Sequence, residues 1–214
     1  MDRTNQHRIS RAVSLLGLLM LAVAVLLAWR NVREANRAGE EALLVCGELR
    51  AVILSAPPRP RPDAPPSVPA QTGAEESGAP SETREVVELG GRAYLGLLSV
   101  PALALELPIL ETCTEDGLKH APCRYSGAAS RGDLVIAGHN YPAHFGALKQ
   151  LSAGDEVLFL SAVGEVYAYR VESMETLEER QVEEMLGGDW DLTLFTCTVP
   201  RTNRLAVRCV RAEI

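Results

Sequence analysis

The pattern of hydrophobic positions divides the chain into three parts, and the first is a long apolar run. From Ala12 to Trp29 no residue carries a formal charge, and most are Leu, Val or Ala. As a helix rising about 1.5 Å per residue, this run would cover about 27 Å, close to the hydrocarbon thickness of a bilayer. Because it is longer than the apolar core of a usual signal peptide, we expect an uncleaved membrane anchor over residues 12–29, with a cleavable signal peptide as the alternative.

The second part contains two segments of different composition. Residues 30–54 are rich in Ala, Glu, Arg and Leu and contain no proline, which predicts a helical juxtamembrane segment. Residues 55–85 hold most of the 13 prolines and little that is apolar, which predicts an extended, flexible linker. With a short tail over residues 1–11, this organisation leaves one domain, residues 86–214.

In that domain, short apolar or alternating runs are bounded by Gly, Pro and Asp, a pattern typical of strands. We expect strands at residues 94–100, 103–110, 133–138, 156–161, 165–171, 191–197 and 203–211. Val163-Gly164 lies between two of these runs and predicts a hairpin. Helical patterns are brief, at residues 144–151 and 177–186. The domain is therefore predicted to be a mainly β barrel or sandwich with one or two short helices.

The charge distribution narrows the functional classes. The formal net charge is −7, and all of it lies in residues 86–214, because basic and acidic residues balance in residues 1–85. An acidic domain is not expected to follow a phosphate backbone, so no nucleic-acid partner is predicted. Arginines flank both ends of the apolar run, so the distribution of positive charge does not by itself decide the orientation in a membrane.

Three residues near predicted strand ends could form a catalytic site. Cys197 ends one strand, and Arg204 begins the next after a six-residue connection, so antiparallel pairing would bring the two together. An arginine beside a cysteine can favour the thiolate and can donate hydrogen bonds to an oxyanion. His139 follows another strand and could supply the acid or base that a cysteine nucleophile needs. By themselves these positions are also compatible with a structural Cys and an isolated His.

The sequence around these residues resembles the sortases, the membrane-anchored transpeptidases of Gram-positive bacteria. Thr193–Cys197 (TLFTC) matches the family signature TLxTC. Further similarity runs in order through residues 92–211, in the segments Tyr94–Pro101, Leu107–Ile109, Ile136–Asn140, His144–Leu148, Gly154–Val157 and Asn203–Val207. The set of matching segments is far more specific than the five-letter signature alone.

The resemblance implies a closed eight-stranded β barrel, with the N-terminus inside the cell and the catalytic domain outside. Cys197 would be the nucleophile that cleaves an LPxTG-like sorting signal and forms a thioester, and His139 would act as acid and base. Arg204 would position the peptide and stabilise the oxyanion. Thr196 and Asn140 would contact the peptide. The acyl group would pass to an amine of a peptidoglycan precursor or of a pilin.

Other residues compete for these roles. His144 and Arg208 are alternatives to His139 and Arg204, whereas His120 is expected to lie solvated in a loop. Cys209 alternates with apolar neighbours and is expected in the core. Cys113 and Cys123 could form a disulfide or remain free thiols. Cys46, on the juxtamembrane helix, could form an intermolecular bridge.

No cofactor is expected. Acidic pairs such as Asp155-Glu156 and Glu183-Glu184 could gather calcium, but their spacing matches no calcium loop.

Two rival functions remain compatible with the sequence. One is an exported Cys/His hydrolase that acts on peptidoglycan or protein, and the other is a non-catalytic, membrane-tethered domain that binds wall components. A hydrolase of this kind usually carries its cysteine at the start of a helix and before its histidine in the chain. Here His139 precedes Cys197, and the cysteine ends a strand, which favours the transpeptidase.

Overall fold

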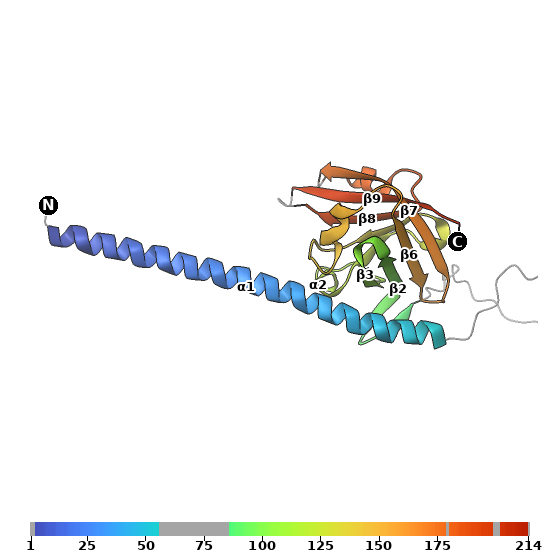
Figure 1. The fold of residues 1–214 in the computed structure, drawn as a ribbon, viewed down its shortest axis with the longest axis horizontal. Coiled ribbons are helices and arrows are strands. Elements are labelled where there is room, and N and C mark those ends of the chain that lie inside the picture. The colour runs from blue at the N-terminus through green and yellow to red at the C-terminus, as the bar shows by residue number, and fades with distance from the viewer. Residues whose placement is uncertain (1–2, 56–85, 179, 199–201, 214) are drawn as a thin grey trace, which may run out of the picture.

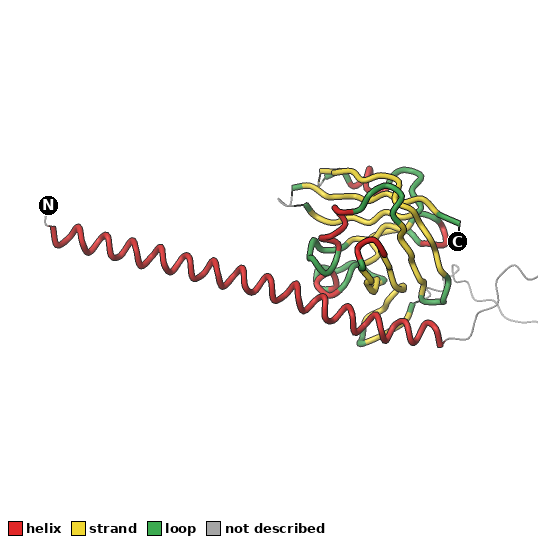
Figure 2. The backbone as a smooth tube through the Cα atoms, viewed as in Figure 1, coloured by secondary structure: helices red, strands yellow, loops and turns green. Residues whose placement is uncertain are grey.

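A long N-terminal helix and a strand-rich body make up the molecule, a computed structural model that describes residues 3–55, 86–178, 180–198 and 202–213. Helix α1 (Arg3–Ser55) runs without a break through the predicted anchor and the predicted juxtamembrane segment. Its first half stands clear of the body, and its second half lies against it (Figures 1 and 2). The predicted linker, apart from Ser55, lies outside the described residues.

The body is built from nine strands, of which eight close a barrel. The closed circuit follows the order β2-β3-β4-β5-β8-β9-β7-β6 and returns from β6 to β2, while β1 pairs only with β2 at its margin. The strands are β1 (Val87–Leu89), β2 (Arg92–Val100), β3 (Leu105–Leu110), β4 (Cys123–Ser126), β5 (Leu134–Ala137), β6 (Glu156–Ser161), β7 (Val166–Glu178), β8 (Leu192–Cys197) and β9 (Asn203–Arg211). This architecture confirms the closed eight-stranded barrel that the resemblance implies.

Short helical segments connect the strands. They are η1 (Pro101–Leu103), α2 (Gly117–His120), η2 (Ala129–Arg131), η3 (Phe145–Gln150) and α3 (Val182–Leu186). The predicted helix at residues 144–151 is a 3₁₀ segment. The helix predicted from residue 177 was wrong at its start, because Leu177 and Glu178 pair with Arg204 and Asn203 in the β7–β9 ladder.

Strand alternation creates two apolar layers, one inside the barrel and one outside. Interior side chains include Ile136, Leu194, Val207 and Cys209, all with no exposed surface, so the prediction that Cys209 is a core residue is confirmed. The outer layer includes Phe195 and Ala206 of β8 and β9 and is continued by α1. A strand residue therefore faces either the closed core or an outer surface where a ligand can bind.

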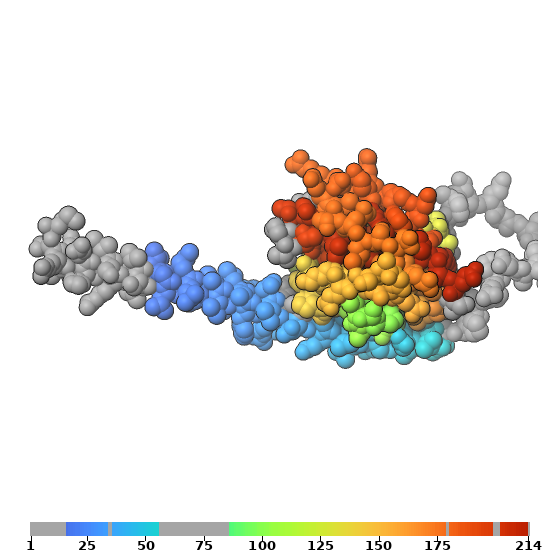
Figure 3. Space-filling model, turned by 45° about the horizontal axis from the view of Figure 1, so that its top comes forward, coloured from blue at the N-terminus to red at the C-terminus, as the bar shows by residue number. Residues whose placement is uncertain are grey.

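Helix α1 packs against the outer layer through one stripe of small and apolar side chains. Its buried members are Ala38, Ala42, Cys46, Leu49 and Ile53, spaced three or four residues apart, which places them on one helix face. An ion pair between Arg50 and Glu106 borders the stripe. Figure 3 shows the cyan end of the helix in contact with the barrel and the blue part standing free. The second half of α1 is therefore part of the folded domain.

Candidate active site

The thiol of Cys197 and the guanidinium of Arg204 meet at one end of the barrel. Cys197 is the last residue of β8, and Arg204 is its direct partner in the antiparallel β8–β9 register. Arg204 Nη1 donates a hydrogen bond to Cys197 Sγ over 3.1 Å. Both residues are half-buried, so the pair is held in place and remains accessible to a ligand. This contact agrees with the pairing predicted from the loop length.

His139 follows β5 and reaches the same end of the barrel. Strands β5 and β8 are parallel, with Ala137 opposite Phe195, and the amide of Gly138 donates to the Phe195 carbonyl oxygen over 3.0 Å. His139 is the next residue after Gly138, and Cys197 is two residues after Phe195. Both therefore lie at the same edge of the sheet. The imidazole is half-buried and lies 4.9 Å from the ring of Tyr141, centroid to centroid.

The backbone before His139 passes too close to a neighbouring ring for any larger residue. A Cβ added to Gly138 would lie 2.6 Å from Cδ2 of Phe145, and the amide of Phe145 donates to the carbonyl oxygen of His139 over 3.1 Å. Gly138 therefore allows this close approach, and η3 fixes the backbone of the histidine.

A mostly apolar cavity of about 300 Å³ opens beside Arg204. The guanidinium lies 5.9 Å from the centre of the Phe195 ring, and Tyr125 packs edge-on against the same ring with centroids 5.2 Å apart. The lining residues are Cys113, Thr114, Glu115, Leu118, Tyr125, Ala137, Gln181, Val182, Met185, Phe195 and Arg204. An apolar cavity with one cation at its edge suits a peptide with small hydrophobic side chains and a reacting carbonyl group.

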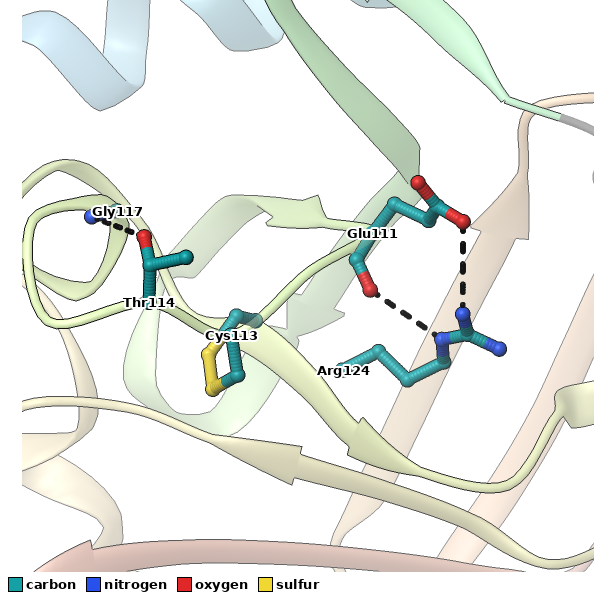
Figure 4. The surroundings of a disulfide bond; sticks show 6 residues. Glu111, Cys113, Thr114, Gly117 and Arg124 are labelled. Carbon is teal, nitrogen blue, oxygen red and sulfur yellow. Dashed lines mark hydrogen bonds and ion pairs between the residues drawn. A yellow bond between two sulfur atoms is a disulfide. The ribbon is translucent and has the colours of Figure 1, made fainter.

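One wall of this cavity is fastened by a disulfide. Cys113 and Cys123 are bonded, with Cα atoms 5.0 Å apart, which decides between the two alternatives left open by the sequence. The surrounding loop is further held by Arg124, whose Nε donates to the Glu111 carbonyl oxygen over 3.3 Å, and by the Gly117 amide, which donates to Thr114 Oγ1 over 3.0 Å (Figure 4).

Another wall is formed by α3, which Arg208 holds against the barrel. Arg208 is 2% exposed, and its Nη1 and Nη2 donate to the carbonyl oxygens of Met185 and Glu184 over 2.9 and 2.6 Å. Its Nε and Nη1 also donate to Glu175 over 2.5 Å and to Thr193 over 3.0 Å. Arg208 pairs with Thr193 near the start of β8, whereas Cys197 is the last residue of that strand. Arg208 is therefore a structural residue of the cavity wall.

Replacement of Arg208 by methionine is expected to loosen α3 and to lower the stability of the protein. The change leaves two main-chain carbonyl groups and Glu175 without their donor, which costs about 3 kcal/mol of unfolding free energy. Chemical denaturation gives the stability, and amide hydrogen exchange in residues 182–186 measures how far α3 has loosened. Arg170→Met, on the exposed side of β7, is the control. Equal stability of both variants would contradict the assignment.

His144, the alternative catalytic histidine, is enclosed beneath α1. It has no exposed surface, and burial lowers the pKa of its imidazole to about 4, helped by the nearby imidazoles of His139 and His120 and opposed by a polar contact with the backbone of Ala38. The Tyr141 ring is a neighbour of both histidines, with its centroid 4.9 Å from that of His139 and 5.6 Å from that of His144. An enclosed, neutral imidazole cannot reach a substrate, so His139 is the better candidate.

His144 should make the fold sensitive to acid. Its pKa falls from 6.5 in the unfolded chain to about 4 in the folded one, so the unfolded chain binds more protons between these values. Stability should therefore decrease as the pH falls through this window, by about 2 kcal/mol at pH 5. The difference in unfolding midpoint between pH 7 and pH 5 should shrink in His144→Phe. The same pH dependence in both proteins would refute this role.

The remaining predicted residues lie near the site but not all point into it. Asn140 is exposed, directly after His139. Thr196 is 3% exposed and alternates with Cys197, so its side chain is on the interior side with Leu194; its contact with peptide stays a prediction. Two expectations were wrong. His120 was expected to be solvated in a loop, but its Nδ1 atom lies 2.7 Å from Glu41 Oε2 of α1. Cys46 was considered for an intermolecular bridge, but it is buried against the barrel, and burial raises the pKa of its thiol to about 12.

The acidic pairs are not gathered into a metal site in the part of the chain that the structure describes. Within it, no three His, Cys, Asp or Glu side chains are grouped so that they could hold a metal ion.

Comparison with known proteins identifies the fold and the family. The model of the sortase domain matches residues 98–212, more than half of the chain and the whole region that contains the site. The chain belongs to the sortase family. Sortase A of Bacillus anthracis is 30% identical over 122 residues, which are 54% of this chain and 57% of that protein. The match thus covers little more than half of the length of this curated sortase.

Solved sortase structures agree with the barrel. Sortase C1 of Streptococcus agalactiae has a TM-score of 0.52 and 25% identity, covering 59% of this chain and 72% of that one. Sortase A of Corynebacterium diphtheriae has a TM-score of 0.51 and 23% identity, covering 57% and 62%, and shows the fold alone. A Clostridium perfringens sortase C, solved with a C-terminal cell wall sorting motif, has a TM-score of 0.50 and 25% identity and covers 56% and 71%.

Proposed function

We propose that this sortase is a cysteine transpeptidase that cleaves an LPxTG-like sorting signal and transfers the protein to an amine of the cell wall or of a pilin. The observation that carries the proposal is the 3.1 Å hydrogen bond from Arg204 Nη1 to Cys197 Sγ, at the end of the barrel to which β5 brings His139. Membership in a family of cysteine transpeptidases gives these three residue types a common chemistry.

Cys197 acts as the nucleophile in the proposed reaction. Its sulfur attacks the carbonyl carbon between Thr and Gly of the signal, the C–S bond of a thioester forms, and the C–N bond breaks. Arg204 is always protonated, so it donates hydrogen bonds to the thiolate and to the carbonyl oxygen as negative charge develops there. His139, protonated before cleavage, gives its proton to the departing amine. The incoming amine then attacks the thioester carbon, so that a new C–N bond forms while the C–S bond breaks and the thiolate of Cys197 leaves, and His139 takes the proton that the amine loses. No cofactor takes part.

The cavity beside Arg204 is the proposed site for the residues that precede the scissile bond. Its apolar walls suit the Leu and Pro side chains of the signal, and the disulfide and α3 limit its width. The Clostridium perfringens sortase C solved with a sorting motif supports peptide binding in this family. We also propose that Asn140 contacts the peptide from the exposed loop and that Thr196, on the interior side of β8, assists binding by holding the strand that carries Cys197 in place.

The proposed location is the cell membrane of a Gram-positive bacterium, crossed once by α1. The helix contains one stretch that is long and apolar enough to cross a membrane, and its apolar window has none of its surface buried inside the protein. In this proposal residues 1–11 are cytoplasmic, residues 12–29 cross the bilayer and the catalytic domain is outside, where the Cys113–Cys123 disulfide is stable.

Amine-dependent transfer of a peptide tests the proposed function. The full chain in detergent is incubated with Leu-Pro-x-Thr-Gly peptides that vary at the third position, with and without a glycine-based or lysine-based amine. We expect cleavage between Thr and Gly and a product joined to the amine. Cleavage by water alone at an unchanged rate would favour an exported hydrolase. Binding of wall fragments without any cleavage would favour a non-catalytic domain.

A further inference from the structure

A second cavity, of about 380 Å³, lies between α1 and α2. On α1 it lies directly after the apolar run, where the helix reaches the barrel. It is lined by Trp29, Arg30, Arg33, Arg37, Ala38, Glu41, Lys119 and His120. None of these residues belongs to the proposed catalytic site or to the peptide cavity.

The cavity is strongly basic, although the domain as a whole is acidic. Arg30, Arg33 and Arg37 follow one another at intervals of three and four residues and so share one face of α1. Lys119 lines the same cavity from α2, and its ammonium group forms an exposed ion pair with Asp116 over 3.6 Å. Such a concentration of cations attracts an anion.

The carboxylate that lines the cavity does not cancel this charge. Three arginines and one lysine line the cavity against this single carboxylate of Glu41, whose Oε2 lies 2.7 Å from His120 Nδ1. Between residues 30 and 37 the sequence adds one acidic residue, Glu34, to the three arginines. The cavity thus keeps an excess of positive charge.

The position of the cavity along α1 matches the level at which the headgroup layer of a membrane would lie. Trp29 ends the apolar run, and Ala38 is the first residue of α1 buried against the barrel among those whose side chains are described. Residues 30–37 span about 12 Å of helix, enough to cross a headgroup layer about 5–8 Å thick. Trp29 is 52% exposed, and the guanidinium of Arg33 lies 4.5 Å from the centre of its ring, an arrangement that suits a membrane interface.

We propose that the cavity between α1 and α2 binds the phosphate of an anionic lipid headgroup; this inference rests on the membrane anchoring proposed above. The phosphate accepts hydrogen bonds from the arginines of α1 and from Lys119 of α2, while the acyl chains lie along the exposed apolar surface before Trp29. A bound lipid therefore links the anchor helix to the barrel and fixes the height of the active site above the membrane.

Native mass spectrometry of the full chain, released from micelles with equimolar phosphatidylglycerol and phosphatidylcholine, tests this proposal. We expect one phosphatidylglycerol molecule to be retained in preference to phosphatidylcholine. Arg33→Gln and Lys119→Gln should each lower this retention about fivefold, and the double variant about 25-fold. The control variant Arg170→Gln with Lys149→Gln removes the same charge from exposed barrel positions and should retain the lipid.

Three results would overturn the proposal. These are equal retention of both lipids, equal loss in the cavity and control variants, and displacement of the lipid by inorganic phosphate at the same concentration, which would indicate a site for soluble phosphate. The readout is lipid mass and not acyl transfer, so a chain without transpeptidase activity could still bind the lipid. Loss of the chain from membranes in an alkaline wash would refute the anchoring instead.

Discussion

Replacement of Cys197 by alanine is expected to abolish transfer of the peptide to an amine, lowering kcat/KM by at least about 10⁴-fold. The reaction as proposed passes through a thioester on this sulfur, and loss of a nucleophile removes the whole covalent route. The residue is half-buried at the end of β8, so the barrel should keep its fold. Chromatography of the peptide products measures the rate, and circular dichroism checks the fold.

Cys209→Ala is the matched control for this variant. Cys209 is the other cysteine of the β8–β9 pair, but it lies in the barrel interior with no exposed surface, and burial raises the pKa of its thiol to about 12. Its replacement should lower stability and leave the activity of the folded protein unchanged. A Cys197→Ala variant that transfers peptide at a rate within tenfold of the wild type would rule out the covalent mechanism.

Replacement of Arg204 by alanine is expected to lower kcat by about 10²–10³-fold, the usual cost of removing a donor to a developing oxyanion. The guanidinium already donates to Cys197 Sγ and borders the peptide cavity. It can therefore donate first to the sulfur and then to the carbonyl oxygen as negative charge develops there. Arg204→Lys should recover only part of the rate, because an ammonium group lacks the planar fork of donors. Initial rates over a range of peptide concentrations separate kcat from KM.

Arg170→Ala is the control for Arg204, since it removes the same charge from an exposed position on β7. It should change neither kcat nor KM. If Arg204→Ala raised KM and left kcat intact, Arg204 would bind the ground state of the peptide and would not stabilise the oxyanion.

Local patterns predicted much of the barrel because its antiparallel ladders depend on local signals. The run at residues 156–161 coincides with β6, and Gly164 takes up φ +86° in the hairpin turn that Val163-Gly164 predicts. The short connection after Cys197 is sufficient to pair it with Arg204. Alternation along β9 also separates interior Cys209 from Arg208 on the other face.

Contacts between distant segments explain what the sequence did not predict. Strand β4 has the sequence CRYS, with no apolar alternation, and it forms through pairing with β5 and a single register pair to β3. The helical pattern from residue 177 yields to β9, because the ladder bonds outweigh a weak local preference. The packing of α1 on the barrel had a signal, the apolar stripe from Ala38 to Ile53, which is equally compatible with a free juxtamembrane helix.

The catalytic candidates were recognisable from sequence, but their surroundings were not. The segments that resemble sortases point to Cys197, His139 and Arg204, whereas nothing local shows that Arg208 holds α3 or that α1 covers His144. The enclosure of His144 depends on a helix about 100 residues earlier in the chain.

The mass of the acylated protein tests the central claim most directly. The full chain is mixed with Leu-Pro-x-Thr-Gly peptides, quenched in acid and analysed intact. We predict an added mass equal to the peptide up to its Thr, less one water, located on Cys197 by digestion, absent in Cys197→Ala and removed by hydroxylamine. Accumulation of cleaved peptide with no adduct, or with an adduct on another residue, would contradict the account.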